Sequence, residues 1–179
     1  MKKVLVISTS LRANSNSDYI AKEFARGAKE AGNEVQYISL RGKNINFCRG
    51  CMACQKLKKC VINDDMIEIE EKMVNSDVIV FATPIYYYEM SGQLKTLLDR
   101  GNPMYEKDYK FRDIYFISTA ADLDTSSCNR AINGLNGWLE CFPKATLKDT
   151  IFQGGVSDEG DVRYMKLVLT QAYQKGTNV

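Results

Sequence analysis

Short runs of apolar residues alternate along the chain with segments in which apolar residues recur at the spacing of one helix face. Apolar runs at residues 4–7, 78–82 and 114–117 predict β-strands, and so do the alternating run at residues 34–40 and a weaker, mixed stretch within 145–152. Helical stripes follow them, beginning near residues 19, 66, 92, 132 and 162. Because right-handed crossovers put helices on both faces of a parallel sheet, this order predicts an α/β fold with a doubly wound, five-stranded parallel sheet of order 2-1-3-4-5.

A polar segment at residues 8–17 joins the first predicted strand to the first predicted helix, and it carries five hydroxyl groups, two amides and one guanidinium. In a sheet of this order ligands bind at the carboxyl ends of strands one and three, and N–H groups at a helix N-terminus attract anions. The segment therefore predicts a phosphate site, although serine and asparagine are also ordinary caps and turn residues that need no ligand. It contains no glycine, which argues against a nucleoside triphosphate loop and a dinucleotide fingerprint.

Composition and charge are typical of a globular protein. Of 179 residues, 45% are hydrophobic and 26% are charged, and this length predicts a single domain over residues 1–179. A net charge of +2 argues against nucleic acid and against an anionic membrane as partners. The apolar run at residues 4–7 is too short for a secretory signal, so we expect a cytoplasmic protein.

The chain contains six cysteines and no histidine. The lack of histidine excludes Ser-His-Asp triads, histidine-based acid/base catalysis and the common histidine-containing zinc and iron sites. An enzyme of this composition must therefore rely on a cofactor, a cysteine or carboxylates.

Four of the cysteines, Cys48, Cys51, Cys54 and Cys60, form the pattern C-x2-C-x2-C-x5-C in a stretch without helical or strand periodicity. Four thiolates this close in sequence suit a [4Fe–4S] cluster, which takes all-cysteine ligation. The same thiols are also compatible with small buried side chains that bind no metal, or with a structural zinc ion. The spacing permits a cluster but does not require one.

Five motifs spread over almost the whole chain share the residue patterns of one family. They are Ser8-Thr9-Ser10-Leu11-Arg12 before Asn16-Ser17, the segment 48–66, Pro84-Ile85-Tyr86, the segment 91–100, and the glycine-containing segment 154–161. As a set they resemble the flavodoxin-fold, NADPH-dependent FMN reductase family, and the cysteine spacing resembles that of its iron–sulfur flavoprotein branch. The resemblance implies a flavodoxin-like fold, FMN as cofactor, NAD(P)H as co-substrate and a homodimer or homotetramer.

The resemblance also implies which residues bind the cofactor. The phosphate cradle would comprise Ser8, Ser10, Leu11, Arg12, Asn14, Asn16 and Ser17; the ring would lie between Pro84, Ile85, Tyr86, Tyr87 and Tyr88 on one side and Thr119, Ala120, Ala121 and Asp122 on the other. No catalytic acid or base is implied, because the hydride chemistry belongs to the cofactor. The tyrosine run has a plainer interpretation as the rim of the hydrophobic core. Thr9 stands where the family more often has glycine, and it restricts the turn at that position.

Three functions remain open at this point. The first is an NAD(P)H-dependent flavin oxidoreductase that reduces a small acceptor such as a quinone, a nitro compound or free flavin. The second is an iron–sulfur flavoprotein that receives electrons from a ferredoxin-like protein through a [4Fe–4S] cluster on the four cysteines. The third is a flavodoxin-type carrier without enzymatic activity, which the net charge of +2 disfavours, because such carriers are commonly acidic.

Overall fold

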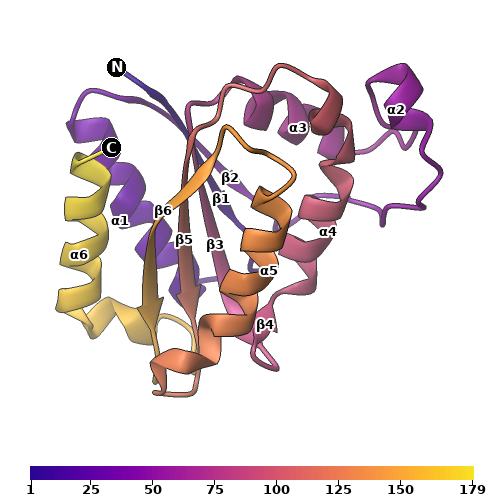
Figure 1. The fold of residues 1–179 in the computed structure, drawn as a ribbon. Coiled ribbons are helices and arrows are strands. Elements are labelled where there is room, and N and C mark those ends of the chain that lie inside the picture. The colour runs from indigo at the N-terminus through magenta and orange to yellow at the C-terminus, as the bar shows by residue number, and fades with distance from the viewer.

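Five parallel strands form the central sheet of the computed structural model, which describes residues 1–179 (Figure 1). They are β1 (Lys3–Ser8), β2 (Glu34–Ser39), β3 (Val78–Tyr86), β5 (Asp113–Thr119) and β6 (Thr146–Gln153). Their order across the sheet is β2-β1-β3-β5-β6, which confirms the predicted doubly wound order 2-1-3-4-5. The register pairs Ser8 of β1 with Ala82 of β3, so the segments that follow these two strands leave the sheet side by side.

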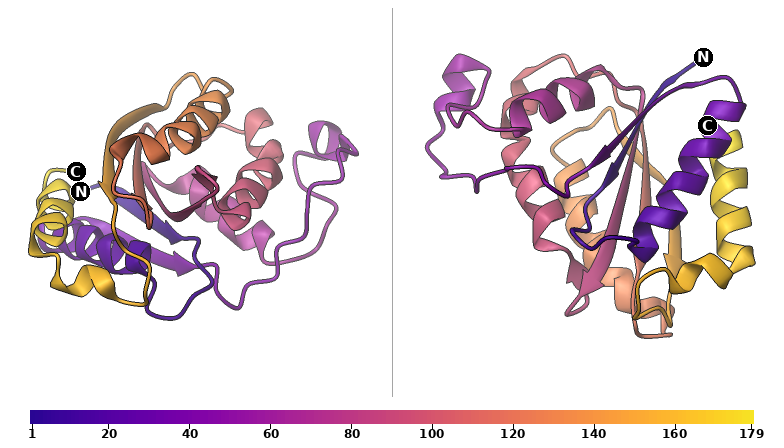
Figure 2. Two further views of the ribbon diagram at one scale, coloured as in Figure 1. Left: turned by 90° about the horizontal axis from the view of Figure 1, so that it is seen from below. Right: turned by 180° about the vertical axis from the view of Figure 1, so that it is seen from behind.

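Helices cover both faces of the sheet (Figures 1 and 2). One face is covered by α1 (Asn16–Glu30) and α6 (Lys166–Thr177), and the other by α3 (Met66–Asn75), α4 (Gly92–Arg100) and α5 (Asn129–Leu139). Three short 3-10 helices, η1 (Asn102–Glu106), η2 (Thr125–Cys128) and η3 (Asp161–Tyr164), lie in the connections. None of the helices has both the length and the apolar character needed to span a membrane.

The structure differs from the predicted pattern in three details. The segment after Ala82, expected as a loop, extends β3 to Tyr86 and returns as the short antiparallel strand β4 (Glu89–Met90). The cysteine-bearing segment contains one short helix, α2 (Ala53–Leu57), which projects from the body of the molecule in Figure 1. Helix α1 begins three residues before Tyr19, so that Asn16 and Ser17 belong to its first turn.

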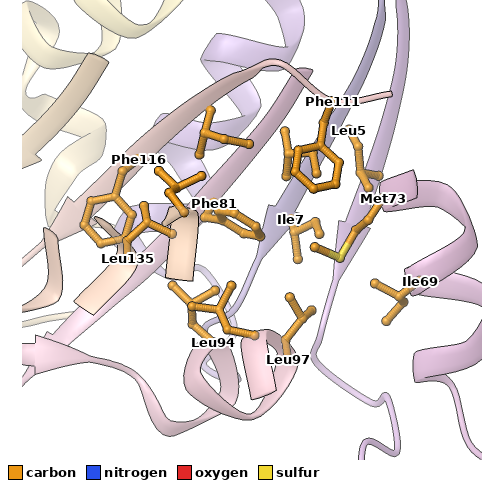
Figure 3. Packing of buried hydrophobic residues seen from close by; sticks show 14 of the residues in the cluster. Leu5, Ile7, Ile69, Met73, Phe81, Leu94, Leu97, Phe111, Phe116 and Leu135 are labelled. Carbon is orange, nitrogen blue, oxygen red and sulfur yellow. The ribbon is translucent and has the colours of Figure 1, made fainter. Parts of the chain in front are cut away.

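The apolar runs are buried because helices pack against both faces of the sheet. Alternate residues of β1 belong to two separate clusters: Leu5 and Ile7 face α3, α4 and α5, whereas Val4 and Val6 face α1 and α6. Figure 3 shows the first cluster, in which strand residues such as Phe81 meet leucines of α4 and α5. Burial on both sides explains why these strands read as continuous apolar runs.

Helices α1 and α6 approach each other closely at two glycines. A Cβ atom at Gly27 would stand 2.1 Å from the carbonyl oxygen of Tyr173, and one at Gly176 would stand 2.1 Å from the carbonyl oxygen of Phe24. Neither distance leaves room for a methyl group, and the obstacle in both cases is backbone. The contact between these helices therefore requires glycine on both sides.

We expect Gly27→Ala to destabilise the protein, because the methyl group forces α6 away from α1. Overpacking of this kind costs about 1–3 kcal/mol, more than the gain of about 0.5–1 kcal/mol from alanine in a helix. Gly137→Ala is the matched control, since Gly137 lies in α5 and a Cβ atom added there would have no neighbour within 4 Å. Urea unfolding should give a lower free energy of unfolding for G27A and an equal or higher one for G137A; equal values for the two would contradict the packing argument.

Candidate functional site

A cavity of about 360 Å³ lies at the carboxyl ends of the strands, where the segments after β1, β3, β5 and β6 meet. Its lining comprises Ser10, Arg12, Ser15, Asn16, Pro84, Ile85, Tyr86, Thr119, Ala120, Ala121, Val156 and Ser157. This is the position at which a doubly wound sheet binds ligands. Arg12 and Tyr86 are the only ionisable side chains in the lining, so the cavity offers one positive charge and no carboxylate.

The wall formed by Ser10, Arg12, Ser15 and Asn16 presents hydrogen-bond donors to the cavity. No group of the chain accepts a hydrogen bond from the backbone N–H groups of residues 13–18, which precede α1 or form its first turn. The side chain of Ser15, at the helix N-cap, contacts the Ser17 hydroxyl at 3.1 Å and does not cap the helix. Free N–H groups together with the positive end of the α1 dipole make this wall suited to an anion.

The segment after β6 closes the cavity and is held there by two residues of the first loop. The Arg12 guanidinium donates to the carbonyl oxygen of Ser157 at 2.7 Å. The Asn16 amide donates to the carbonyl oxygen of Asp158 at 2.9 Å and accepts from the N–H of Val162 at 3.1 Å. These bonds fix a segment more than 140 residues away in sequence against the start of α1.

A chain of buried hydroxyl groups ties the first loop to the loop after β3. The Thr9 hydroxyl donates to the carbonyl oxygen of Ala82 at 3.0 Å and lies 3.1 Å from the Ser91 hydroxyl. Ser91 in turn accepts from the N–H of Leu94, which caps α4, and its own N–H donates to the Thr83 hydroxyl at 3.0 Å. Thr9 has no positive φ, so threonine fits this turn without strain and adds a hydrogen bond that glycine would lack.

The three tyrosines after β3 have different surroundings. Tyr86 lines the cavity together with Pro84 and Ile85. Tyr87 and Tyr88 occupy the β3–β4 turn with φ values of 50° and 65°, and their exposed fractions are 97% and 53%. They are therefore neither part of the core rim nor part of the cavity wall.

The cavity brings together nine of the sixteen residues expected to bind the cofactor. These are Ser10, Arg12, Asn16, Pro84, Ile85, Tyr86, Thr119, Ala120 and Ala121. The other seven, Ser8, Leu11, Asn14, Ser17, Tyr87, Tyr88 and Asp122, lie outside its lining. Ser8 is fully buried in β1, Leu11 lines a neighbouring hollow, and Asp122 accepts a hydrogen bond from the N–H of Asp124.

Sequence reasoning missed three lining residues, Ser15, Val156 and Ser157. A signal for the last two was present in the Gly154-Gly155 pair that precedes them. A Cβ atom at Gly154 would stand 2.4 Å from the carbonyl oxygen of Asp122, so only glycine allows the segments after β5 and β6 to meet. A glycine pair after a predicted strand therefore indicated a close backbone approach at this edge of the sheet.

All four cysteines of the C-x2-C-x2-C-x5-C segment line one hollow beside the C-terminal end of α4. Cys48 and Cys51 are exposed, Cys60 is half-buried, and Cys54 is buried and accepts a hydrogen bond from the Asn102 amide at 3.1 Å. No three cysteine or carboxylate side chains converge closely enough to hold a single metal ion. A four-iron cluster carries one thiolate on each iron, so its ligands stand further apart than those of one tetrahedral ion, and the four cysteines of this hollow are the donor set that such a cluster takes.

The cysteine segment is anchored to the body of the protein by a fully buried ion pair. Arg100, the last residue of α4, donates to both carboxylate oxygens of Asp64 at 2.7 and 2.9 Å, and neither side chain is exposed. Burial alone would raise the pKa of Asp64, but hydrogen bonds from Arg100 and Asn46 hold that pKa well below its usual range. The carboxylate therefore stays charged, and the pair persists at neutral pH.

Similar proteins of known name share parts of this sequence. An iron–sulfur flavoprotein of Methanocaldococcus jannaschii is 40% identical over 102 residues, which cover 57% of this chain and 53% of that protein. An iron–sulfur flavoprotein of Methanosarcina thermophila is 28% identical over 156 residues, covering 87% of this chain and 82% of that protein. The chain spans about half the length of most of the curated relatives that it matches.

The fold also matches solved structures. The NAD(P)H:quinone oxidoreductase from Methanothermobacter marburgensis superposes with a TM-score of 0.69 at 15% identity, over 99% of this chain and 96% of that one. At this identity the likeness concerns the flavodoxin-like fold alone. The sequence model of the NADPH-dependent FMN reductase family matches residues 2–144, which is most of the chain, and the protein therefore belongs to that family.

Proposed function

We propose that the protein is an FMN-dependent oxidoreductase that takes reducing equivalents from NAD(P)H and passes them to a small acceptor such as a quinone, a nitro compound or free flavin. The observation that carries this proposal is the cavity at the switch point of the sheet, with unpaired N–H groups on one wall and Pro84, Ile85 and Tyr86 on another. Bound FMN would supply the hydride and single-electron chemistry. Membership in the FMN reductase family supports the same cofactor and the same electron donor.

The residues of the cavity have separate tasks in this proposal. The free N–H groups of Ser15 and Asn16, the Ser10 hydroxyl and the Arg12 guanidinium bind the phosphate of FMN. Pro84 to Tyr86 and Thr119 to Ala121 border the ring from two strand ends and exclude water from it. No carboxylate, lysine or cysteine lines the cavity, so the Tyr86 hydroxyl, water and the acceptor's own groups are the proton sources open to turnover.

The second candidate function, electron transfer through a [4Fe–4S] cluster, is favoured by the four cysteines around one hollow. The names of the curated relatives point in the same direction. Cysteines 48, 51, 54 and 60 would each bind one iron, and the cluster would transfer single electrons when present. The cluster and the FMN would lie near opposite ends of α4, which is roughly 13 Å long at 1.5 Å per residue.

The charge around the cysteines supports an acidic, ferredoxin-like electron donor for this second function. Between residues 41 and 63 the chain has six basic residues and no acidic ones. Arg49, Lys56, Lys58 and Lys59 are exposed and form no ion pair. We call these four residues the basic rim; opposite charge on a partner would speed its encounter with this face.

The cofactor content of protein purified without exposure to air tests both functions. We expect flavin absorption bands and oxidation of NADPH when menadione or FMN is added. Iron and sulfide in equal amounts, with broad additional absorption, support the cluster. Colourless protein that takes up no FMN at micromolar concentration would exclude the first function, and FMN binding without turnover of either nicotinamide would favour a flavodoxin-type carrier.

We expect Arg12→Ala to weaken FMN binding by about tenfold or more, since hydrogen bonds to charged groups contribute about 1.5–3 kcal/mol. The loss has two sources, the missing positive charge and the released segment at Ser157. Quenching of FMN fluorescence measures the affinity. Arg41→Ala is the control, because Arg41 is exposed, lies outside the cavity lining and should leave affinity unchanged. Equal affinity in R12A and the unmodified protein would remove Arg12 from the phosphate site.

Charge reversal in the basic rim tests the acidic donor. We expect the triple variant Lys56→Glu, Lys58→Glu, Lys59→Glu to be reduced by a plant-type ferredoxin about tenfold more slowly at low salt, with the difference vanishing as salt screens the charges. Reduction by NADPH should not change. The control reverses Lys3, Lys29 and Lys166, which are also exposed and belong to β1, α1 and α6, elements that lie away from α2 in Figure 1. Equal slowing in both triple variants would show that only net charge matters and would contradict docking at the rim.

A further inference from the structure

Arg100 is buried with one hydrogen-bond donor left over. A guanidinium has five N–H donors. Four of them face acceptors: two bond the carboxylate of Asp64, one bonds the carbonyl oxygen of Asn46 at 2.7 Å, and one faces that of Ile62 at 3.4 Å. The fifth, on Nε, is buried and has no hydrogen-bond partner. Because an unsatisfied buried donor on a charged group is costly, this N–H calls for an explanation.

The remaining N–H belongs to a side chain that lines the cysteine hollow. Arg100 and Cys60 are both part of that lining. A negatively charged sulfur in this hollow would satisfy the leftover donor.

A second donor reaches the same hollow from the residue two positions further along. Asn102, at the start of η1, donates from its side-chain amide to the Cys54 sulfur at 3.1 Å. The end of α4 and the beginning of η1 thus place two side-chain donors in the lining of the hollow, and the Asn102 donor already bonds a cysteine sulfur. Cys48 and Cys51, on the exposed side of the segment, have no such donor.

We propose that Arg100, through Nε–H, and Asn102, through its amide, donate hydrogen bonds to metal-bound cysteine sulfurs and thereby raise the reduction potential of a cluster held by the four cysteines. This inference rests on the proposed iron–sulfur function. Arg100 and Asn102 are positioning residues, because they act on the sulfurs and bind no iron themselves. Hydrogen bonds to cluster sulfurs are one of the factors that set cluster potentials.

The direction of the effect follows from charge. Reduction adds one negative charge to the cluster and its thiolates, and donors pointing at the sulfurs stabilise that charge. Asp64 keeps the guanidinium charged and oriented, while the bonds to Asn46 and Ile62 hold the two ends of the cysteine segment. The same side chain therefore fixes the segment and favours the reduced state.

The test compares midpoint potentials of proteins reconstituted with ferrous iron and sulfide without air. Arg100→Lys keeps the positive charge but removes the Nε–H, and Asn102→Ala removes the donor to Cys54. We expect each to disfavour the reduced cluster by about tenfold, which lowers the potential by about 59 mV for one electron. Iron content should remain that of the unmodified protein.

Gln55→Ala is the matched control for Asn102→Ala, since Gln55 is an exposed amide next to Cys54 that donates to no sulfur. Its potential should not change. If R100K fails to fold, N102A decides the question alone, because the Asn102 side chain is exposed. Unshifted potentials at full cluster content overturn this inference and leave the iron–sulfur function intact. Unmodified protein that takes up no cluster overturns both.

Discussion

The parallel pairing of β1 with β3 is the constraint on which the proposed site depends. Both strands are buried on two faces, so their register is fixed by packing, and Ser8 stands opposite Ala82. The next residue continues the pairing, since the Thr9 N–H and hydroxyl both bond the carbonyl oxygen of Ala82. The donor-rich loop and the tyrosine-bearing hairpin therefore diverge from one point. The cavity between them is a consequence of strand order and not of any single lining residue.

The cysteine segment is held by a different kind of interaction. It has only the five-residue α2 as a helix, and both ends of α2 are in the left-handed conformation, at Met52 and Lys58. Arg100 holds the cysteine segment in place where regular secondary structure is scarce, because its guanidinium bonds Asp64 and the carbonyl groups on either side of the cysteines. Breaking a buried pair of this kind typically costs about 3–5 kcal/mol, since one charge is left without its partner.

The sequence predicted what depends on local pattern and missed what depends on distant contacts. Residues 4–7 and 78–82 are continuous apolar runs, and such runs identify buried strands directly. The β3–β4 hairpin was not predicted because its turn consists of Tyr87 and Tyr88. Turns with two positive φ values usually contain asparagine or glycine, and these residues are the signal by which such turns are recognised in a sequence. The segment after β6 was not predicted as a wall of the cavity, because the Asn16 side chain holds it there across the fold. Asn16 was instead expected to bind phosphate with that side chain.

Helix α4 is attached at its first turn to the loops beside the cavity and at its last residue to the cysteine segment. At its first turn Ser91 joins the hydroxyl chain from Thr9 to Thr83, and at its last residue Arg100 holds the cysteine segment. Both attachments are buried, so the helix cannot shift along its axis without breaking one of them. Because interiors are close-packed, α4 holds the loop after β3 and the cysteine segment in a fixed relation to each other.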